Sequence, residues 1–216
     1  MTTIEYVVVA LSVVLLGGYH ATFFYQTKKT PGRTEVGKAH ARRAVWVDRM
    51  VARDDRILAI QTLRNWTMSA TYLASTAILI AAGLLGFLVS VDKISTLVLE
   101  MNVLGSQDAS LITLKLVALI ANFFAAFFNF TLSLRFYNYV ALDIGAADQS
   151  ASSDERKEIV GHLKRAAYHY TLGMRGYYLC IPILLWIFGP LWLLAGSVLT
   201  TIALYRHDRV AGHRSI

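Results

Sequence analysis

The sequence predicts an all-α integral membrane protein with four transmembrane helices and additional amphipathic helices on the cytoplasmic side. Three observations lead to this fold class. Of the 216 residues, 56% are hydrophobic and only 16% are charged, with a mean hydropathy of +0.48, whereas soluble domains carry about 25% charged residues. The apolar residues gather into long runs, and the lysine and arginine residues gather in particular loops. The alternating segments of about 10 residues that a transmembrane β-barrel requires do not occur in the sequence.

Four apolar runs are each long enough to cross a hydrocarbon core of about 30 Å, which requires roughly 20 helical residues. They are Ile4–Gln26, Trp66–Ser90, Leu111–Leu142 and Gly176–Tyr205. Each run is predicted to be helical because backbone groups in lipid must be hydrogen-bonded internally. The first run carries Glu5 and has neither a positively charged start nor a small-residue cleavage pattern. We therefore expect it to be retained rather than removed as a signal peptide.

The distribution of lysine and arginine predicts the orientation of a multi-pass protein of the inner (plasma) membrane. The loop 27–65 contains ten of these residues against four acidic ones, whereas the loop 91–110 contains only Lys93 against three acids. The positive-inside rule therefore places loops 27–65 and 143–175 in the cytoplasm, and the N-terminus and loop 91–110 outside. The net charge of +7 follows from this topology and suits an anionic inner leaflet, so no nucleic-acid partner is required.

The last apolar run is interrupted by the sequence FGP at Phe188–Pro190, which leaves two interpretations. A single helix kinked at Pro190 would place the basic tail outside, against the positive-inside rule. Two short helices folded back on each other would return the tail to the cytoplasm. Each half would have only about 13–15 residues, which is short for a span, so the sequence favours the kinked helix.

Two of the loops carry helical patterns of their own. In the segment 35–63, apolar residues recur with helical spacing and arginines occupy the other side. These arginines are Arg42, Arg49, Arg53 and Arg56. Ser152–Glu155, SSDE, is a capping box that predicts the start of a second helix over about 153–171. A shorter interfacial helix is predicted at Ile94–Leu104, on the outer side. We expect the two cytoplasmic helices to pack together within a single transmembrane helical domain spanning 1–216.

Two sequence segments carry a resemblance to a known family. One pairs QTLRN at Gln61–Asn65 with LAST at Leu73–Thr76, and the other is RGYYLCIPILLWIFGP at Arg175–Pro190. Together they resemble a family of bacterial and plant membrane proteins that is known only as a domain of unknown function. The resemblance implies a four-helix membrane fold, and it implies no activity, cofactor or catalytic residue.

Every predicted span brings a cationic or polar side chain to a similar depth on the cytoplasmic side. The residues concerned are Arg64, Asn65, Arg135, Asn138, Arg175 and His20. Arginines that gather at one depth repel one another unless an anion or carboxylates lie among them, so this set is a candidate site for an anion or a lipid headgroup. The alternative is that the arginines only anchor helix ends at the headgroups. Asp143 and Asp148 are candidate counter-charges.

The third span carries a second polar feature. Lys115, Asn122 and Asn129 are spaced by seven residues and therefore lie along one face of a helix in a bundle. Such residues either hydrogen-bond between helices and fix their packing or line a water-filled pathway. Lys115 is also close enough to the outer end of the span to extend toward the interface.

Catalysis has little support in the sequence. The histidines lack the HExxH or Cys/His spacing of zinc sites, and no Walker A loop, nucleophile elbow or dinucleotide fingerprint occurs. The sequence therefore predicts no catalytic residue, no metal site and no cofactor. The single cysteine, Cys180, excludes an intrachain disulfide.

These observations predict a small homo-oligomeric inner-membrane protein that resembles a channel or transporter for a small solute, an anion being one candidate. The alternative is a non-catalytic membrane scaffold or assembly factor that binds anionic lipid or another membrane protein. The expected partners in either case are membrane lipids, anionic on the cytoplasmic side, and further copies of the chain. A continuous polar cavity at Asn122 and Asn129 would favour transport, whereas a dry bundle would favour the scaffold.

Overall fold

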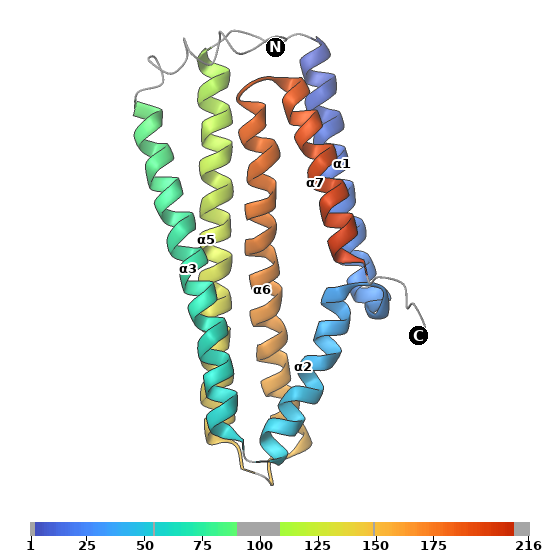
Figure 1. Ribbon diagram of the computed structural model, residues 1–216, viewed down its shortest axis with the longest axis vertical. Helices are drawn as coiled ribbons and strands as arrows, with labels where there is room; N and C mark the ends of the chain where they lie inside the picture. Colours follow the sequence, from blue (N-terminus) through green and yellow to red (C-terminus); the bar gives the residue numbers. More distant parts are fainter. Residues whose placement is uncertain (1–2, 54, 90–108, 149, 210–216) are drawn as a thin grey trace. The chain divides into compact units, whose positions relative to one another are not determined.

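The structure is a computed structural model in which residues 3–53, 55–89, 109–148 and 150–209 are described. Its α-helices and one 3-10 turn follow one another along the chain (Figure 1). They are α1 Thr3–Lys29, η1 Pro31–Arg33, α2 Glu35–Ala52, α3 Arg56–Val89, α5 Ala109–Ala146, α6 Ser153–Trp186 and α7 Pro190–Asp208. The described residues contain no β-strand, so the predicted all-α class is confirmed.

Three of the described helices are long and apolar enough to cross a membrane, judged by length and composition. These segments are Glu5–Lys29 in α1, Arg56–Leu88 in α3 and Leu111–Ala146 in α5. They coincide with the first three predicted spans. The segments in α3 and α5 have 33 and 36 residues, which is more than the roughly 20 that a span requires.

The fourth predicted span, a single kinked helix over 176–205, is wrong. Helix α6 continues from Ser153 to Trp186, the chain turns, and α7 begins at Pro190 as a separate helix. The cause is local. Gly189 adopts a φ of 135°, a conformation open to glycine but strained for other residues, and Pro190 is suited to a first helical position because it has no N–H to satisfy there.

The turn folds α7 back along the last part of α6. A Cβ atom placed on Gly196 of α7 would lie 3.1 Å from Cα of Pro182 in α6, so the two backbones approach closely at this glycine. The N–H groups of Ile187, Phe188 and Gly189 donate to carbonyls three residues earlier, at 3.1 Å each. The turn therefore leaves none of these three donors unsatisfied, and the hairpin interpretation that the sequence disfavoured is the one observed.

The predicted cytoplasmic helices are found with changed boundaries. The segment 35–63 is not one helix, because α2 ends at Ala52 and α3 begins at Arg56. The helix predicted over 153–171 is the first part of α6, and its capping box is confirmed. The N–H of Ser152 donates to the Glu155 carboxylate at 2.7 Å, and the N–H of Glu155 donates to Oγ of Ser152 at 3.2 Å. The interfacial helix predicted at Ile94–Leu104 lies outside the described residues.

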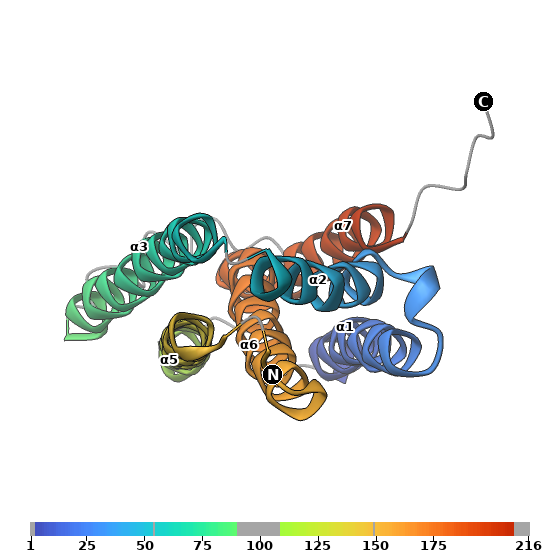
Figure 2. The same cartoon turned by 90° about the horizontal axis from the view of Figure 1, so that it is seen from below.

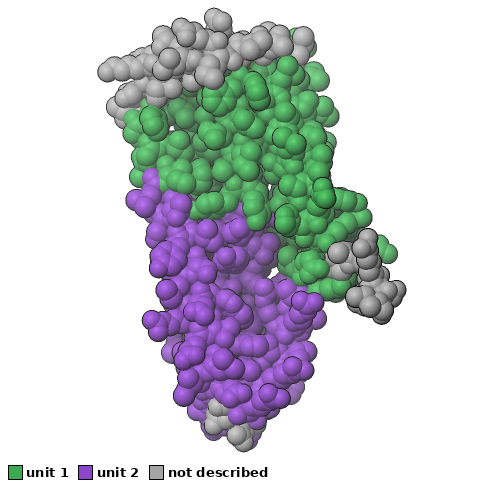
Figure 3. Space-filling model, in the orientation of Figure 1, with its two compact units in different colours: residues 1–38, 80–123, 177–216 green, residues 39–79, 124–176 purple. Residues whose placement is uncertain are grey.

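The chain divides into two compact units (Figure 3). Unit 1 comprises residues 1–38, 80–123 and 177–216, and unit 2 comprises residues 39–79 and 124–176. In unit 1, α7 packs against α1, and the two helices are seen from below in Figure 2. Near their ends, the Tyr19 hydroxyl of α1 donates to the Asp208 carboxylate of α7, and Thr34 forms a backbone bridge with Arg209.

The core of unit 2 joins α2, α3, α5 and α6. Its fully buried members include Val47, Leu63, Val140 and Leu163, one from each helix. The rings of Trp46, Trp66 and Tyr137 form a chain with centroid separations of 5.5 and 5.7 Å. The apolar side of α2 is therefore part of this core, as its amphipathic pattern predicted.

The hydroxyl side chains at the start of α3 bond within their own helix. Those of Thr62, Ser69, Thr71 and Thr76 each donate to the carbonyl four residues earlier, at distances between 2.8 and 3.0 Å. These donors are satisfied without a partner from another helix.

Candidate anion-binding site

The predicted cytoplasmic polar residues differ in their burial. Arg64, Asn65 and Asn138 are exposed, whereas Arg175 is only 4% exposed. Arg135 is exposed as well, and its Nε donates to the Tyr139 hydroxyl at 2.7 Å. These five residues belong to unit 2.

His20, the sixth member of the predicted set, belongs to unit 1, where its Nδ1 lies 2.7 Å from the Leu16 carbonyl oxygen of the same helix. The gathering of all six residues around one anion stays a prediction.

The residues of the predicted polar stripe make different contacts. Nδ2 of Asn129 donates to the Ala125 carbonyl at 2.8 Å, and its Oδ1 lies 3.1 Å from Nδ1 of His169 on α6. Asn129 thus takes part in a contact between α5 and α6, while Asn122 is half-buried.

Lys115 is buried in unit 1 rather than extended toward an interface. It is 4% exposed, and its ammonium lies 5.8 Å from the centroid of the Trp186 ring. Glu5 of α1 is also 4% exposed and is close enough to Lys115 for their charges to attract. Two opposite charges therefore share the interior of this unit, an arrangement that the sequence did not indicate.

A cluster of histidine and aromatic rings joins α5 and α6 in unit 2. The Phe136 ring stacks on His162 and on His169, with centroid separations of 6.2 and 5.7 Å. The Arg165 guanidinium lies 5.8 Å from the centroid of the same ring. Nδ1 of His162 is 2.8 Å from the Asp143 carboxylate, so Asp143 serves as a partner for this histidine.

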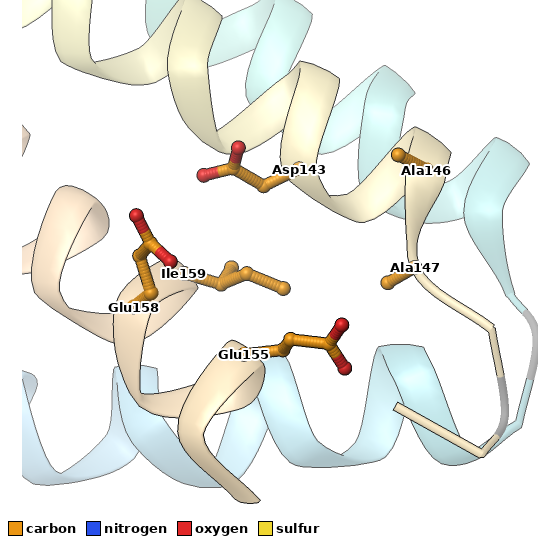
Figure 4. A pocket seen from close by; sticks show the side chains of 6 residues that line it. All are labelled: Asp143, Ala146, Ala147, Glu155, Glu158 and Ile159. Carbon is orange, nitrogen blue, oxygen red and sulfur yellow. The ribbon is translucent and has the colours of Figure 1, made fainter. Parts of the chain in front are cut away.

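Beside this cluster, Figure 4 shows a small hollow lined by three carboxylates. Its volume is about 190 Å³, and its lining residues are Asp143, Ala146, Ala147, Glu155, Glu158 and Ile159. Two of the three carboxylates already have partners, Asp143 in His162 and Glu155 in the capping box. The described residues include no group of three or more His, Cys, Asp or Glu side chains placed to hold a metal ion.

A second electrostatic feature of unit 2 is positive. Nη1 of Arg43 in α2 is buried and has no hydrogen-bond partner. The same is true of Nδ1 of His40, one turn earlier in the helix. Burial lowers the pKa of the Arg43 guanidinium, while the nearby Tyr137 of α5 acts in the opposite direction. Burial also lowers the pKa of His40, with further contributions from the charges of Arg43 and of Lys164 on α6. Within the described part of the chain, no acidic side chain forms an ion pair with Arg43, His40 or Lys164.

Sequence reasoning missed His40 and Arg43 as candidate site residues. The helical pattern of the segment 35–63 predicted a polar side formed by Arg42, Arg49, Arg53 and Arg56. Arg43, by contrast, lies four residues before the buried Val47 and hence on the same side of the helix as Val47. An arginine at an apolar position of an amphipathic helix was the signal that could have identified it.

No curated protein and no solved structure matches the chain. Residues 7–212, nearly the whole chain, match the family described as "Protein of unknown function, DUF599". This agrees with the resemblance to a domain of unknown function that the QTLRN and RGYY segments indicated. The chain belongs to the DUF599 family.

Proposed function

We propose that the protein is a non-catalytic scaffold of the inner membrane that binds anionic lipid on the cytoplasmic side. One observation carries the proposal. Helix α2 buries Val47, Met50 and Val51 in the core of unit 2 and exposes Arg42 and Arg49 on its other side, and the exposed Arg53 directly follows its last residue. These arginines, Arg42, Arg49 and Arg53, form no ion pair with a described acidic side chain. A rigidly held helix with an unpaired basic face is suited to an anionic leaflet.

The hairpin supports a topology with the N-terminus outside and the C-terminal end inside. Tyr178 of α6 lines a common hollow with His207 and Asp208, so the end of α7 returns to the level of that part of α6. Arg206 and Arg209 would then lie on the same side as Lys28, Lys29 and Arg33, since Thr34 forms a backbone bridge with Arg209. The conflict between the basic tail and the positive-inside rule disappears in this arrangement.

Reporter fusions test this topology. We expect fusions at Glu35, at Ser152 and at Ser215 to report a cytoplasmic position, and a fusion at Gly105 to report an external one. The fusion at Ser215 is decisive, because a hairpin places it inside and a single kinked span places it outside. An external report at Ser215 would contradict the proposed topology.

Lipid retention in native mass spectrometry tests the scaffold function. Replacing Arg42, Arg49 and Arg53 by glutamine should reduce retention of phosphatidylglycerol about a hundredfold, at about 1 kcal/mol per arginine near the surface. Phosphatidylcholine retention should not change. The control removes three other exposed charges, with Arg64→Gln, Arg135→Gln and Lys157→Gln. If only the control loses the anionic lipid, the lipid binds at Arg64, Arg135 or Lys157 and not at Arg42, Arg49 and Arg53.

Transport of a small anion is the second candidate, favoured by the buried pair Glu5 and Lys115, since ionisable residues within a membrane often mark a pathway. The contact between Asn129 and His169 supports the scaffold instead, because it uses the polar stripe for helix packing. Anion flux measured with the purified protein in proteoliposomes distinguishes the scaffold function from transport. A scaffold gives no anion flux, whereas a pathway gives flux that Asn122→Leu changes.

A further inference from the structure

In unit 2, the half-buried His40 and Arg43 of α2 lie near the exposed Lys164 of α6, and none of the three forms an ion pair with a described acidic side chain. His40 and Arg43 are one turn apart on α2, and Lys164 of α6 is close enough for its charge to repel that of His40. Tyr137 of α5 is near enough to Arg43 to influence its charge. Nη1 of Arg43 and Nδ1 of His40 are buried without hydrogen-bond partners.

An uncompensated guanidinium is among the costliest groups to bury, and natural proteins seldom leave a buried donor unsatisfied unless water or an ion completes it. Like charges in a partly desolvated setting also repel more strongly than in water. One anion among these groups would resolve both costs at once. We propose that His40, Arg43 and Lys164 form a binding site for a phosphate group.

A phosphate fits the donors better than a carboxylate does. The donors come from two helices, His40 and Arg43 from α2 and Lys164 from α6. A tetrahedral anion presents oxygens toward several directions, whereas a carboxylate presents two in one plane. The planar fork of Arg43 suits two phosphate oxygens, and the Lys164 ammonium adds a point charge.

An open groove next to the cluster shares Lys164 with it. It has a volume of about 700 Å³ and lies between α2 and the first part of α6. Ala44, which follows Arg43, and Lys164 both line it, together with Arg156 and Lys157. Asp48 is the one carboxylate of this lining. The groove is larger than an inorganic phosphate ion requires, so both a free phosphate and the phosphate of a lipid headgroup are sources to be tested.

This site is separate from the exposed arginines of α2 that carry the proposed function. Arg42, Arg49 and Arg53 are exposed, whereas Arg43 is on the core side. An experiment can therefore contradict the phosphate site without contradicting lipid binding by the exposed arginines, and the reverse. A variant with glutamine at positions 42, 49 and 53 should retain the response to phosphate described next.

The test measures the thermal unfolding midpoint of the full-length protein in a neutral detergent. The probes are inorganic phosphate, acetate at the same ionic strength, and phosphatidylglycerol in mixed micelles. Because a ligand that binds only the folded state stabilises it, we expect phosphate or phosphatidylglycerol, but not acetate, to raise the midpoint of the parent protein. Arg43→Met, made in the variant with glutamine at positions 42, 49 and 53 so that those arginines do not contribute, should abolish the rise. It should also raise the midpoint of the ligand-free protein, since it removes a largely buried charge and keeps the apolar stem.

Two further variants are measured in the same way, Arg43→Lys as a second test of the site and Arg165→Met as a control. Arg43→Lys keeps the charge without the fork and should weaken the response at least severalfold, which provides a second measurement if Arg43→Met does not fold. Arg165→Met removes the charge next to Lys164 in sequence and should respond as the parent does. A response to inorganic phosphate assigns the site to free phosphate, and a response to the lipid alone assigns it to a headgroup. An absent response in the parent, an equal response to acetate, or a full response in both Arg43 variants would overturn the proposal.

Discussion

Lys115→Leu should destabilise the folded protein by about 3–5 kcal/mol, the cost of removing one partner from a buried charge pair. Lys115 and Glu5 are each 4% exposed and attract each other across α5 and α1. Removing the ammonium takes away a positive charge that attracts the buried Glu5 carboxylate. The measurement is the free energy of unfolding in mixed micelles with increasing denaturing detergent.

The matched variant combines Lys115→Leu with Glu5→Gln. Because the double variant buries no net charge, it should recover most of the lost stability, so the two substitutions should be strongly non-additive. Additive losses would show that the two side chains do not act as a pair. A neutral Lys115→Leu would show that the ammonium reaches water.

Gly173→Ala should destabilise the protein by about 1–3 kcal/mol, the usual cost of overpacking a core. A Cβ atom at Gly173 on α6 would lie 2.7 Å from Cε1 of Phe130 on α5. Phe130 is fully buried, at 0% exposure, so its ring has no room to move away. The measurement is again the free energy of unfolding.

Gly161 on the same helix is the control, because a Cβ atom there would meet nothing within 4 Å. Gly161→Ala should stabilise the protein by roughly 0.5–1 kcal/mol through the better helix propensity of alanine. Combining Gly173→Ala with Phe130→Leu should restore part of the loss by freeing space. Equal effects of the two single glycine variants would contradict the close packing at Phe130.

Features that depend on local sequence could be predicted. The long apolar runs of α1, α3 and α5 and the capping box of Ser152 and Glu155 follow from periodicity and from residues a few positions apart. The hairpin at Gly189 could not be predicted, since glycine followed by proline is compatible with a kink and with a reversal. What decides between them is the close approach of Gly196 to Pro182, a tertiary contact.

The candidate site shows the same limit. The exposed arginines of α2 could be identified as a polar face from their spacing. The pairing of Glu5 with Lys115 joins residues 110 positions apart in sequence, and the approach of Lys164 to His40 depends on how α6 packs on α2. Distances of this kind arise from the packing of helices, which the periodicity of one helix does not specify.

The hydrogen bonds of the α3 hydroxyl groups affect how readily this helix transfers from water into hydrocarbon. A hydropathy scale assigns threonine and serine the transfer cost of a hydroxyl that loses its hydrogen bonds to water. In α3, the hydroxyls of Ser69, Thr71 and Thr76 keep a bond by donating to a carbonyl of the preceding turn. The surrounding solvent then meets mainly the methyl and methylene groups of these side chains. The first half of α3 should therefore dissolve in hydrocarbon more readily than its residue composition indicates.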